Sequence, residues 1–572
     1  MRDKLDLSFE DRGEIEVKNI ARPVRVFGVI LDEKAGALVT AVVAVPGDTA
    51  PRRWSALVVG LAISIIAAAG LVWWQPWVPR SPTDLADEVT LSSSDKPSIA
   101  VLPFDNLSND SEQEYFADGL TDDLITDLSK ISGLFVIARS SVFTYKDQVI
   151  DIRDVARELG VRYVLEGSVR RAGGNVRINA QLIDGRTGSH LWAERYDRQY
   201  ADIFAIQDEV IERIVEALSV QLTETERIEV ERLPTDNLEA YDNYLRGEKL
   251  AYRAEAGSVA DALKFYQKAI ALDPNFADAH AGYARVAVDV LTFGFLDNLP
   301  SAVARKRAYE AAGRALSLNP RLARSYSVLA LLQMLESEHE NAVASARRAV
   351  ALNPNGAEAH LNLAVVLVYA GQQNEAIQAM ETVLRLNPKP PSYVHEYYGL
   401  ALYMNRRYAE ALAALRQENN VTKSDLGLEL LAAVNARMGR MDAAKAAIQS
   451  ILERIPDQCL ACYRVLFAHH AREEDRAERL EALRLAGLPE WPYGFEGDPA
   501  FQLTGDAIDA LIDGRTWIGE RVGSGAFMQY VQANGAFIER GPDYQLVGTV
   551  SRKGDMLCFQ SPAILLGRQH CG

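Results

Sequence analysis

The chain has 572 residues and a formal net charge of −17 at neutral pH. Hydrophobic residues make up 48% and charged residues 24%, an ordinary globular composition for about three or four domains. The acidic balance argues against a general nucleic-acid-binding protein, so no nucleic acid is expected as a partner. Four cysteines are too few for a disulfide-dense scaffold.

The alternating stretch 5–31 predicts a β-hairpin with a turn at Arg12-Gly13. This stretch resembles the C-terminal strands of class III adenylate and guanylate cyclases, and the matching residues are Gly13, Lys18, Asn19, Ile20, Pro23 and Val24. The resemblance implies that residues 1–51 are the relic of a truncated cyclase tail. The metal-binding aspartates of that family precede this tail, and no residue here can be assigned their role. We therefore expect no catalytic residue, unless an upstream catalytic half makes the protein an adenylate cyclase.

An uncharged apolar run covers residues 54–74, which is long enough to cross a bilayer as a helix. Two arginines precede the run and tryptophans cluster at its far end, a pattern that favours a cytoplasmic N-terminus. The sequence thus predicts a single-pass protein of a bacterial inner membrane, with its bulk in the periplasm. The polar segment 80–96 is expected to be a linker.

Residues 97–225 alternate strand and helix patterns, which predicts an α/β sandwich. Strands are expected at 98–104 and 134–139, and 112–131 has the spacing of an amphipathic helix. The wording SIAVLPFDNLS, FADGLTDDLITDLSKI and YVLEGSVRRAGG resembles TolB-like N-terminal domains. The resemblance implies an interaction or assembly module and names no catalyst or ligand.

Two charged groups in this region could suggest a binding site. Four aspartates on the predicted helix are interpreted as a solvated face rather than a metal site, because no ligand shell converges on them. They are Asp118, Asp122, Asp123 and Asp127. Arg170 and Arg171, beside Gly173-Gly174, could hold an anion, but an exposed hairpin tip is the favoured interpretation. No metal and no cofactor are expected.

Internal repetition marks the middle of the chain. Leu-Asx-Pro tripeptides recur with spacings of 46, 34 and 34 residues, and they end at Pro274, Pro320, Pro354 and Pro388. Alanines lie twelve residues before each proline, where paired helices must approach closely. The 34-residue period resembles tetratricopeptide repeats, so 237–488 is expected to be an all-α solenoid with capping helices. Such a solenoid presents a groove for peptides or proteins. Tyr326, His360 and Tyr397 are interpreted as packing residues.

The cysteines fall in two pairs. Cys459 and Cys462 could form a local disulfide, and zinc or redox chemistry at this pair lacks the necessary surroundings. Residues 494–572 carry short alternating segments separated by glycines, which predicts a small antiparallel β module. Cys558 and Cys571 could be joined by a disulfide within that module.

The fold class expected from the sequence is therefore multidomain. It combines one transmembrane helix, a TolB-like α/β sandwich, an all-α tetratricopeptide solenoid and a small antiparallel β module. The expected function is protein or peptide binding, without catalysis. The alternative is an adenylate cyclase whose catalytic half is missing or encoded upstream. A membrane-bound transcription regulator is disfavoured because the predicted cytoplasmic part is short and carries mixed charges.

Overall fold

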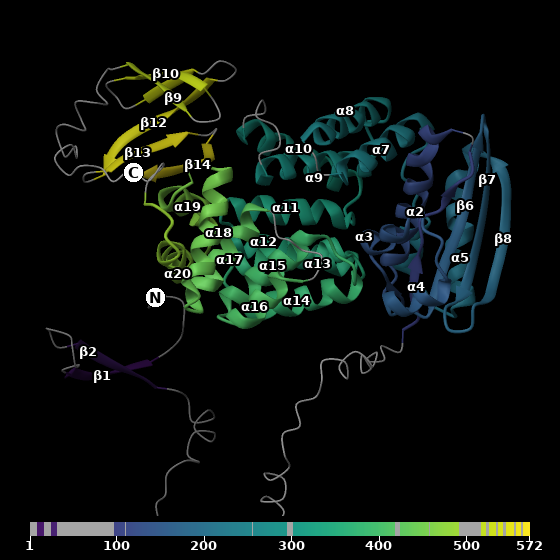
Figure 1. Ribbon diagram of the computed structural model, residues 1–572, viewed down its shortest axis with the longest axis horizontal. Helices are drawn as coiled ribbons and strands as arrows, with labels where there is room; N and C mark the ends of the chain where they lie inside the picture. The colour runs from purple at the N-terminus through teal and green to yellow at the C-terminus, as the bar shows by residue number, and fades with distance from the viewer. Residues whose placement is uncertain are drawn as a thin grey trace, which may run out of the picture. The chain divides into compact units, whose positions relative to one another are not determined.

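The computed structural model describes residues 96–490, apart from 109, 254–255, 294–300, 418–423 and 457, together with the strands within 8–30 and 516–571. The chain divides into two compact units, Met1–Thr90 and Leu91–Gly572 (Figure 1). The predicted segments 54–74 and 80–95 lie outside the described residues.

The described part of the first unit is a pair of antiparallel strands, β1 (Ser8–Ile15) and β2 (Val24–Ile30). Their register shifts between Asp11 and Glu14. The turn expected at Arg12-Gly13 is therefore an irregularity inside β1, and the strands are joined further along the chain. An extra residue in one strand of an antiparallel pair produces this kind of shift without ending the strand.

The fold class predicted from the sequence is corrected by the structure. The described residues are mostly a helical solenoid, and no helix among them is both long and apolar enough to cross a membrane. The longest of these helices, α10 (Ser301–Leu318), has 18 residues and includes Arg305, Arg307 and Arg314. Helices of this kind pack one face and solvate the other. The single-pass architecture and the inner-membrane location predicted with it are both withdrawn.

The second unit begins with a sheet in the order β5-β3-β6-β7-β8, and β4 also pairs with β6. The strands β3, β4 and β5 run parallel to their neighbours, whereas β6, β7 and β8 form an antiparallel meander. The strands are β3 (Ser98–Val101), β4 (Asp105–Asn106), β5 (Phe135–Val136), β6 (Tyr163–Ala172), β7 (Asn175–Asp184) and β8 (Ser189–Gln199). Its helices are α2 (Glu114–Ser129), α3 (Arg139–Val142), α4 (Ile152–Leu159), α5 (Ile203–Ala217) and α6 (Glu224–Val230). We refer to 96–230 as the α/β unit.

The local sequence explains where these elements begin and end. Asp151 accepts a hydrogen bond from the Arg153 N–H and so caps α4, and Gly160 ends that helix at a φ of 67°. Such a backbone conformation favours glycine because it lacks a Cβ. The strand expected at 134–139 is only two residues long, and shortly after its end the N–H of Ala138 donates to the carbonyl of Leu386 in the solenoid.

The solenoid consists of antiparallel helix pairs stacked side by side (Figure 1). The pairs are α7 (Leu238–Ala251) and α8 (Ala256–Leu272), α9 (Ala277–Phe293) and α10, α11 (Ala323–Leu335) and α12 (His339–Leu352), α13 (Ala357–Tyr369) and α14 (Gln373–Leu386), α15 (Ser392–Met404) and α16 (Tyr408–Leu415), and α17 (Asp425–Arg437) and α18 (Met441–Arg454). The helices α19 (Leu460–Leu466) and α20 (Glu473–Leu485) follow. The alanines twelve residues before the repeat prolines are all fully buried, as the close approach of the helices requires.

The last described element is a six-stranded antiparallel sheet whose strands follow one another in chain order. Its strands are β9 (Thr516–Arg521), β10 (Gly525–Val531), β11 (Ala536–Arg540), β12 (Gln545–Lys553), β13 (Met556–Ser561) and β14 (Ile564–Cys571). The sequence indicated the first five of these segments and missed β14. In the backbone register, Cys558 of β13 lies opposite Cys571 of β14. The disulfide between them stays a prediction.

Candidate functional site

A groove of about 840 Å³ runs along the inner face of the solenoid and is bordered by the α/β unit. Its floor comes from the first helices of five successive pairs, α7, α9, α11, α13 and α15. One wall comes from α2, α3 and the segment 229–234. The groove is thus built by both parts of the second unit, rather than by the repeats alone.

The repeat phase decides which side chains face the groove. The position four residues after the first three repeat prolines is occupied by Asp278, Arg324 and Glu358, and all three line the groove. The position eleven residues after a proline is Arg285, Leu331 and Val365, and the position fifteen residues after is Asp289, Leu335 and Tyr369. At these two later positions the lining therefore changes from charged on α9 to apolar or aromatic on α11 and α13, whereas the position four residues after the proline is charged on all three helices. The phase that predicted the buried alanines could also have identified these floor positions from the sequence.

Arg285 and Asp289 form the charged end of the floor. The Arg285 Nη1 atom lies 3.1 Å from a carboxylate oxygen of Asp289, one turn further along α9. The Nη2 atom of Arg285 is buried without a hydrogen-bond partner. Burial raises the pKa of Asp289 to about 6, although Arg285 opposes the rise. This carboxyl group is therefore poised to change charge in mildly acidic solution.

Arg324 lies deeper and is held by a carboxylate of the first helix pair. Its Nη1 atom is 2.7 Å from Glu248 Oε1 and 3.3 Å from the hydroxyl of Tyr244. The same Glu248 oxygen accepts a hydrogen bond of 2.8 Å from Tyr266. Glu248 is 4% exposed, and its pKa is lowered because the nearby guanidinium groups and the Tyr266 hydroxyl outweigh the opposing effect of burial. The residue is an anchor for Arg324 rather than a free acid.

The side chain of Arg139, on α3, lines the groove from the side of the α/β unit. Its guanidinium lies over the rings of Phe143 and Tyr252, 3.7 and 3.9 Å from their centroids. Its Nε atom is 3.3 Å from Asp122. Burial raises the pKa of Asp122 to about 6, against the lowering effect of Arg139. The stacked guanidinium and the ring of Tyr252, which remains 40% exposed, form a rigid edge of the groove.

The α/β unit is fixed to the solenoid by hydrogen bonds from the repeat turns. Asn355 donates to the carbonyls of Ser129 and Ile131, at 3.3 and 3.0 Å. Asn387 Oδ1 accepts from the hydroxyls of Ser140 and Ser141, at 3.0 and 2.5 Å. Both asparagines belong to the turns between repeats. The α/β unit therefore docks on positions that recur in every repeat of the solenoid.

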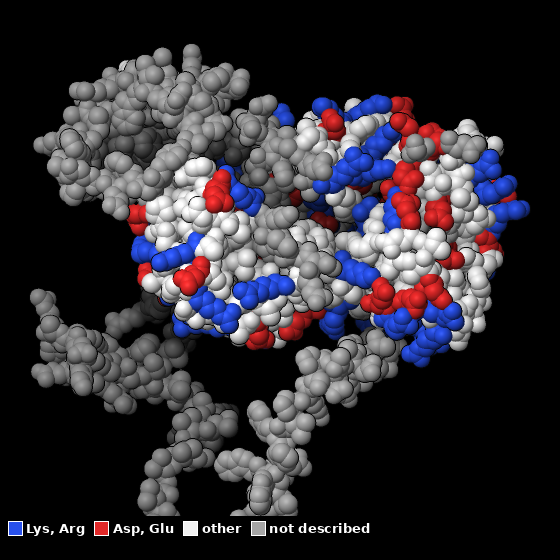
Figure 2. All heavy atoms as spheres, in the orientation of Figure 1, with Lys and Arg blue, Asp and Glu red and all other residues white. Residues whose placement is uncertain are grey.

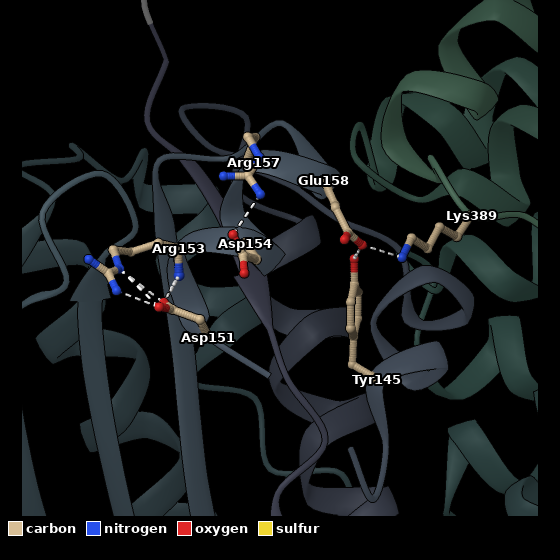
Figure 3. A network of polar contacts seen from close by, with 7 residues as sticks. All are labelled: Tyr145, Asp151, Arg153, Asp154, Arg157, Glu158 and Lys389. Atoms are coloured by element: carbon tan, nitrogen blue, oxygen red, sulfur yellow. Dashed lines mark hydrogen bonds and ion pairs between the residues drawn. The ribbon is translucent and has the colours of Figure 1, made fainter. Parts of the chain in front are cut away.

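A second contact lies at the outer edge of this interface, on α4 (Figure 3). Lys389, just after a repeat proline, reaches Glu158 with its Nζ atom 2.5 Å from Oε2. The Tyr145 hydroxyl donates to the same carboxylate oxygen at 2.8 Å. These two donors hold the pKa of Glu158 below its usual value. Figure 3 also shows the Asp151–Arg153 and Asp154–Arg157 pairs, which stay within α4 and its cap.

Two interpretations made from the sequence of the α/β unit are wrong. The aspartates of α2 are not a solvated face, because Asp118 and Asp122 are only 6% and 9% exposed. Asp118 pairs with Lys146, and Asp123 accepts a hydrogen bond from Tyr241. Arg171 is not at a free hairpin tip either, since its guanidinium binds Asp242 of α7 at 3.0 to 3.2 Å. In each case the partner is distant in sequence, so local pattern could not reveal it.

The other singled-out residues have defined places. Tyr326 and His360 each contact the carbonyl of the repeat proline six residues before them, at 3.2 and 2.9 Å. Tyr397 instead lines the groove. Cys459 and Cys462 are joined as a disulfide at the start of α19. Within the described ranges, no group of three or more His, Cys, Asp or Glu side chains is placed to hold a metal ion.

Charges on the surface are mixed. Figure 2 shows Lys and Arg interspersed with Asp and Glu over the face that it draws. That face has no continuous basic patch of the kind that nucleic-acid-binding domains present.

Family models of known proteins match two parts of the chain. Tetratricopeptide repeat models match residues 328–389 and 361–419, which confirms the predicted repeats. A model described as the second domain of HilA/YgeH-like transcriptional regulators matches residues 94–230. This match, and not a TolB-like family, covers the α/β unit.

One relative is the "Putative adenylate cyclase 3" of Rhizobium meliloti strain 1021, which is 46% identical over 286 residues. The alignment covers 50% of this chain and 41% of the relative, so the chain matches less than half of that protein's length. The similarity confirms that the chain is related to a protein with a cyclase name. It does not reach the whole of that protein.

Solved structures resemble parts of this chain only with low TM-scores. PilF of Pseudomonas aeruginosa is 22% identical and covers 39% of this chain and 94% of its own, with a TM-score of 0.30. TolB from Acinetobacter baumannii is 21% identical and covers 23% of this chain and 30% of its own, with a TM-score of 0.18. At these scores neither structure carries an argument, so the TolB-like resemblance is left without support.

Proposed function

We propose that this chain binds an extended segment of a partner protein in the groove between the solenoid and the α/β unit. The observation that carries the proposal is the groove itself, with exposed aromatic rings on a wall of packed helices. Tyr252 and Tyr393 line it and keep 40% and 48% of their surface exposed. Large apolar side chains left open in a concave site are typical of ligand surfaces.

The repeats support this function because they form a known protein-interaction fold. The α/β unit supports it differently, by closing one side of the groove with fixed side chains such as Arg139. A bound segment would touch both parts, so the two would act as one receptor. Preorganised walls of this kind reduce the ordering cost of binding.

The test uses the full chain and a panel of fluorescently labelled twelve-residue peptides that differ in aromatic, aliphatic and charged content. Binding is measured by anisotropy. Tyr252→Ala and Tyr393→Ala should each weaken the best peptide about tenfold or more, as the loss of an aromatic contact does. The control is Tyr530→Ala, since Tyr530 is 44% exposed on β10 and outside the groove. Equal loss in all three variants, or no binding by any peptide, would refute the proposal.

A second candidate function is adenylate cyclase activity, and the 46% identity to the Rhizobium meliloti protein favours it. We propose that binding, rather than cyclic AMP synthesis, is the role of this chain, because no residue of the sequence can be assigned to the two-metal chemistry. The chain would then act as the binding part of a cyclase-related signalling protein. Expression in cells that lack their own cyclase should leave cyclic AMP at the vector level. Accumulation above that level would support the enzyme instead.

A further inference from the structure

The charged groups of the groove differ in whether the protein itself satisfies them. The six basic side chains that line it are Lys130, Arg139, Arg232, Arg285, Arg321 and Arg324. Five of them have a carboxylate within ion-pair distance. The sixth, Arg232, donates to the carbonyl of Leu318 at the end of α10, at 3.0 Å. Each basic side chain therefore already has at least one internal acceptor, although the Nη2 atom of Arg285 has none.

Three carboxyl groups of the same lining are different. Asp208 on α5, Asp278 on α9 and Glu358 on α13 form neither an ion pair nor a hydrogen bond with any described residue. Glu358 is exposed, and its charge interacts electrostatically with Arg285 and Arg324, although neither is within ion-pair distance. Burial raises the pKa of Asp208 to about 6, and the nearby acids Asp127, Glu231 and Glu212 add to the rise. The charged side chains of the groove that remain without an ion pair are therefore acidic, so a ligand that neutralises them would be positively charged.

The first-turn position of Asp278 and Glu358 has a simpler explanation, since acids are favoured at helix N-termini. The repeat phase argues against that explanation as the whole cause. The equivalent residue of α11 is Arg324, which is unfavourable at a helix N-terminus and is instead directed to Glu248. The position is therefore used for the groove and not only for the helix dipole.

The aromatic rings of the groove suit the same kind of ligand. Tyr393, 48% exposed, lies close enough to Glu358 for that charge to raise its pKa, after burial as the main cause. Tyr252, at the end of α7, already has the guanidinium of Arg139 over its ring. Where an exposed ring lies beside a carboxylate without an ion pair, the face of the ring and the negative charge can bind the same cation.

We infer that the partner segment is basic, with lysine or arginine side chains that pair with Glu358 and Asp278 and apolar side chains between them. The inference rests on the proposed function, because it names the chemistry of the segment that the groove would hold. The apolar part would lie on Leu331, Leu335 and Val365, which separate the charged positions along the floor. A cation at each acid would complete the pairing that the protein leaves open.

Three synthetic peptides test this inference. They share one aromatic and aliphatic pattern over twelve residues and carry lysine, glutamate or glutamine at the remaining positions. We expect the lysine peptide to bind the full chain at least about tenfold more tightly than the glutamate peptide. The difference should shrink when the salt concentration is raised, as screening requires.

Variants then place the contact. Glu358→Gln and Asp278→Asn should each weaken the lysine peptide about fivefold to tenfold and leave the glutamine peptide within about twofold. The matched control is Glu340→Gln, a first-turn acid of α12 that is exposed outside the groove. Circular dichroism checks that each variant is folded.

The outcomes separate the two proposals. If no peptide binds, the proposed function itself fails. If the glutamate or glutamine peptide binds most tightly and the tyrosine variants weaken it, the groove stands and the basic partner is wrong. If the lysine peptide binds best but neither acid variant weakens it more than Glu340→Gln does, the assigned contacts are wrong.

Discussion

Charged side chains at the capping helices and in the groove differ in how many internal partners they have. At the cap, Arg479 is 1% exposed and binds both carboxylate oxygens of Glu429 at 2.7 Å. It also contacts His470 at 2.9 Å and lies over the ring of Phe467. In the groove, Arg285 forms an ion pair with a single carboxylate, that of Asp289. The acid Glu358 forms no ion pair or hydrogen bond with any described residue. The comparison teaches that a saturated buried charge holds the fold, whereas an unsaturated one on an open wall is available to a ligand.

The cap should show the largest effect on stability. Glu429→Ala leaves the buried guanidinium of Arg479 without its anion, which costs about 3 to 5 kcal/mol of unfolding free energy. Burial holds the pKa of His470 well below its usual range, as does the positive charge of Arg479. The histidine therefore cannot replace the lost carboxylate. Urea denaturation followed by circular dichroism measures the change, and a loss below about 1 kcal/mol would contradict it.

The docking turn should show the next largest effect. Asn387→Ala removes the acceptor of two serine hydroxyls at a buried position, which costs about 1 to 3 kcal/mol. The loss should be concentrated where the α/β unit meets the solenoid. Hydrogen exchange should therefore accelerate in α3 and near Leu386, with little change at the cap. Uniform acceleration over the whole second unit would instead indicate a general loss of stability.

The groove should give a pH dependence of its own through Asp289. The pKa of Asp289 is about 6, above its ordinary value of 3.8, and the charged or titratable groups that interact with it include Arg285, Glu358, Tyr393 and Tyr397. Between these two values the folded chain binds a proton that the unfolded chain has released. Wild type should thus gain stability relative to Asp289→Asn as pH falls from about 6 towards 3.8, and lose that gain as pH rises through 6.

The magnitude of this effect is about 1 to 2 kcal/mol after allowance for partial exposure. Thermal unfolding of both proteins at several pH values measures it. A difference that does not change with pH would show that Asp289 is an ordinary solvated carboxylate.

The outer ion pair between Lys389 and Glu158 should show the smallest effect. Both side chains are more than a third exposed, so Lys389→Ala should lower the unfolding free energy by at most about 1 kcal/mol. Raised salt should reduce the difference further. A loss as large as that of Asn387→Ala would mean that this edge, and not the repeat turns, fixes the α/β unit.

The sequence could predict those features that repeat or alternate along the chain. The proline spacing predicted the helix pairs, and the buried alanines followed from the same phase. The glycine-separated segments after residue 494 indicated most of the last sheet, but β14 was missed because Ile564–Cys571 does not alternate clearly.

Contacts between distant parts of the chain could not be predicted in this way. Asp242 sits on an ordinary helix and Arg171 on an ordinary strand, and only the fold brings them together. The acids of α2 were misread for the same reason, since their partners come from α3, α7 and the segment after α3. The membrane prediction rested on one apolar run, 54–74, with arginines before it and tryptophans at its far end. That run lies outside the described residues, and no helix within them is long and apolar enough to span a membrane.

The measurement that tests the groove most directly is site-specific photo-crosslinking to the lysine peptide. A photoreactive phenylalanine analogue is placed at Tyr393, inside the groove, and separately at Leu191, which is 47% exposed on β8 outside it. We predict a covalent adduct at position 393 and none above background at position 191. Equal adducts at both positions, or none at 393 while the peptide is bound, would contradict the assignment of the groove as the binding site.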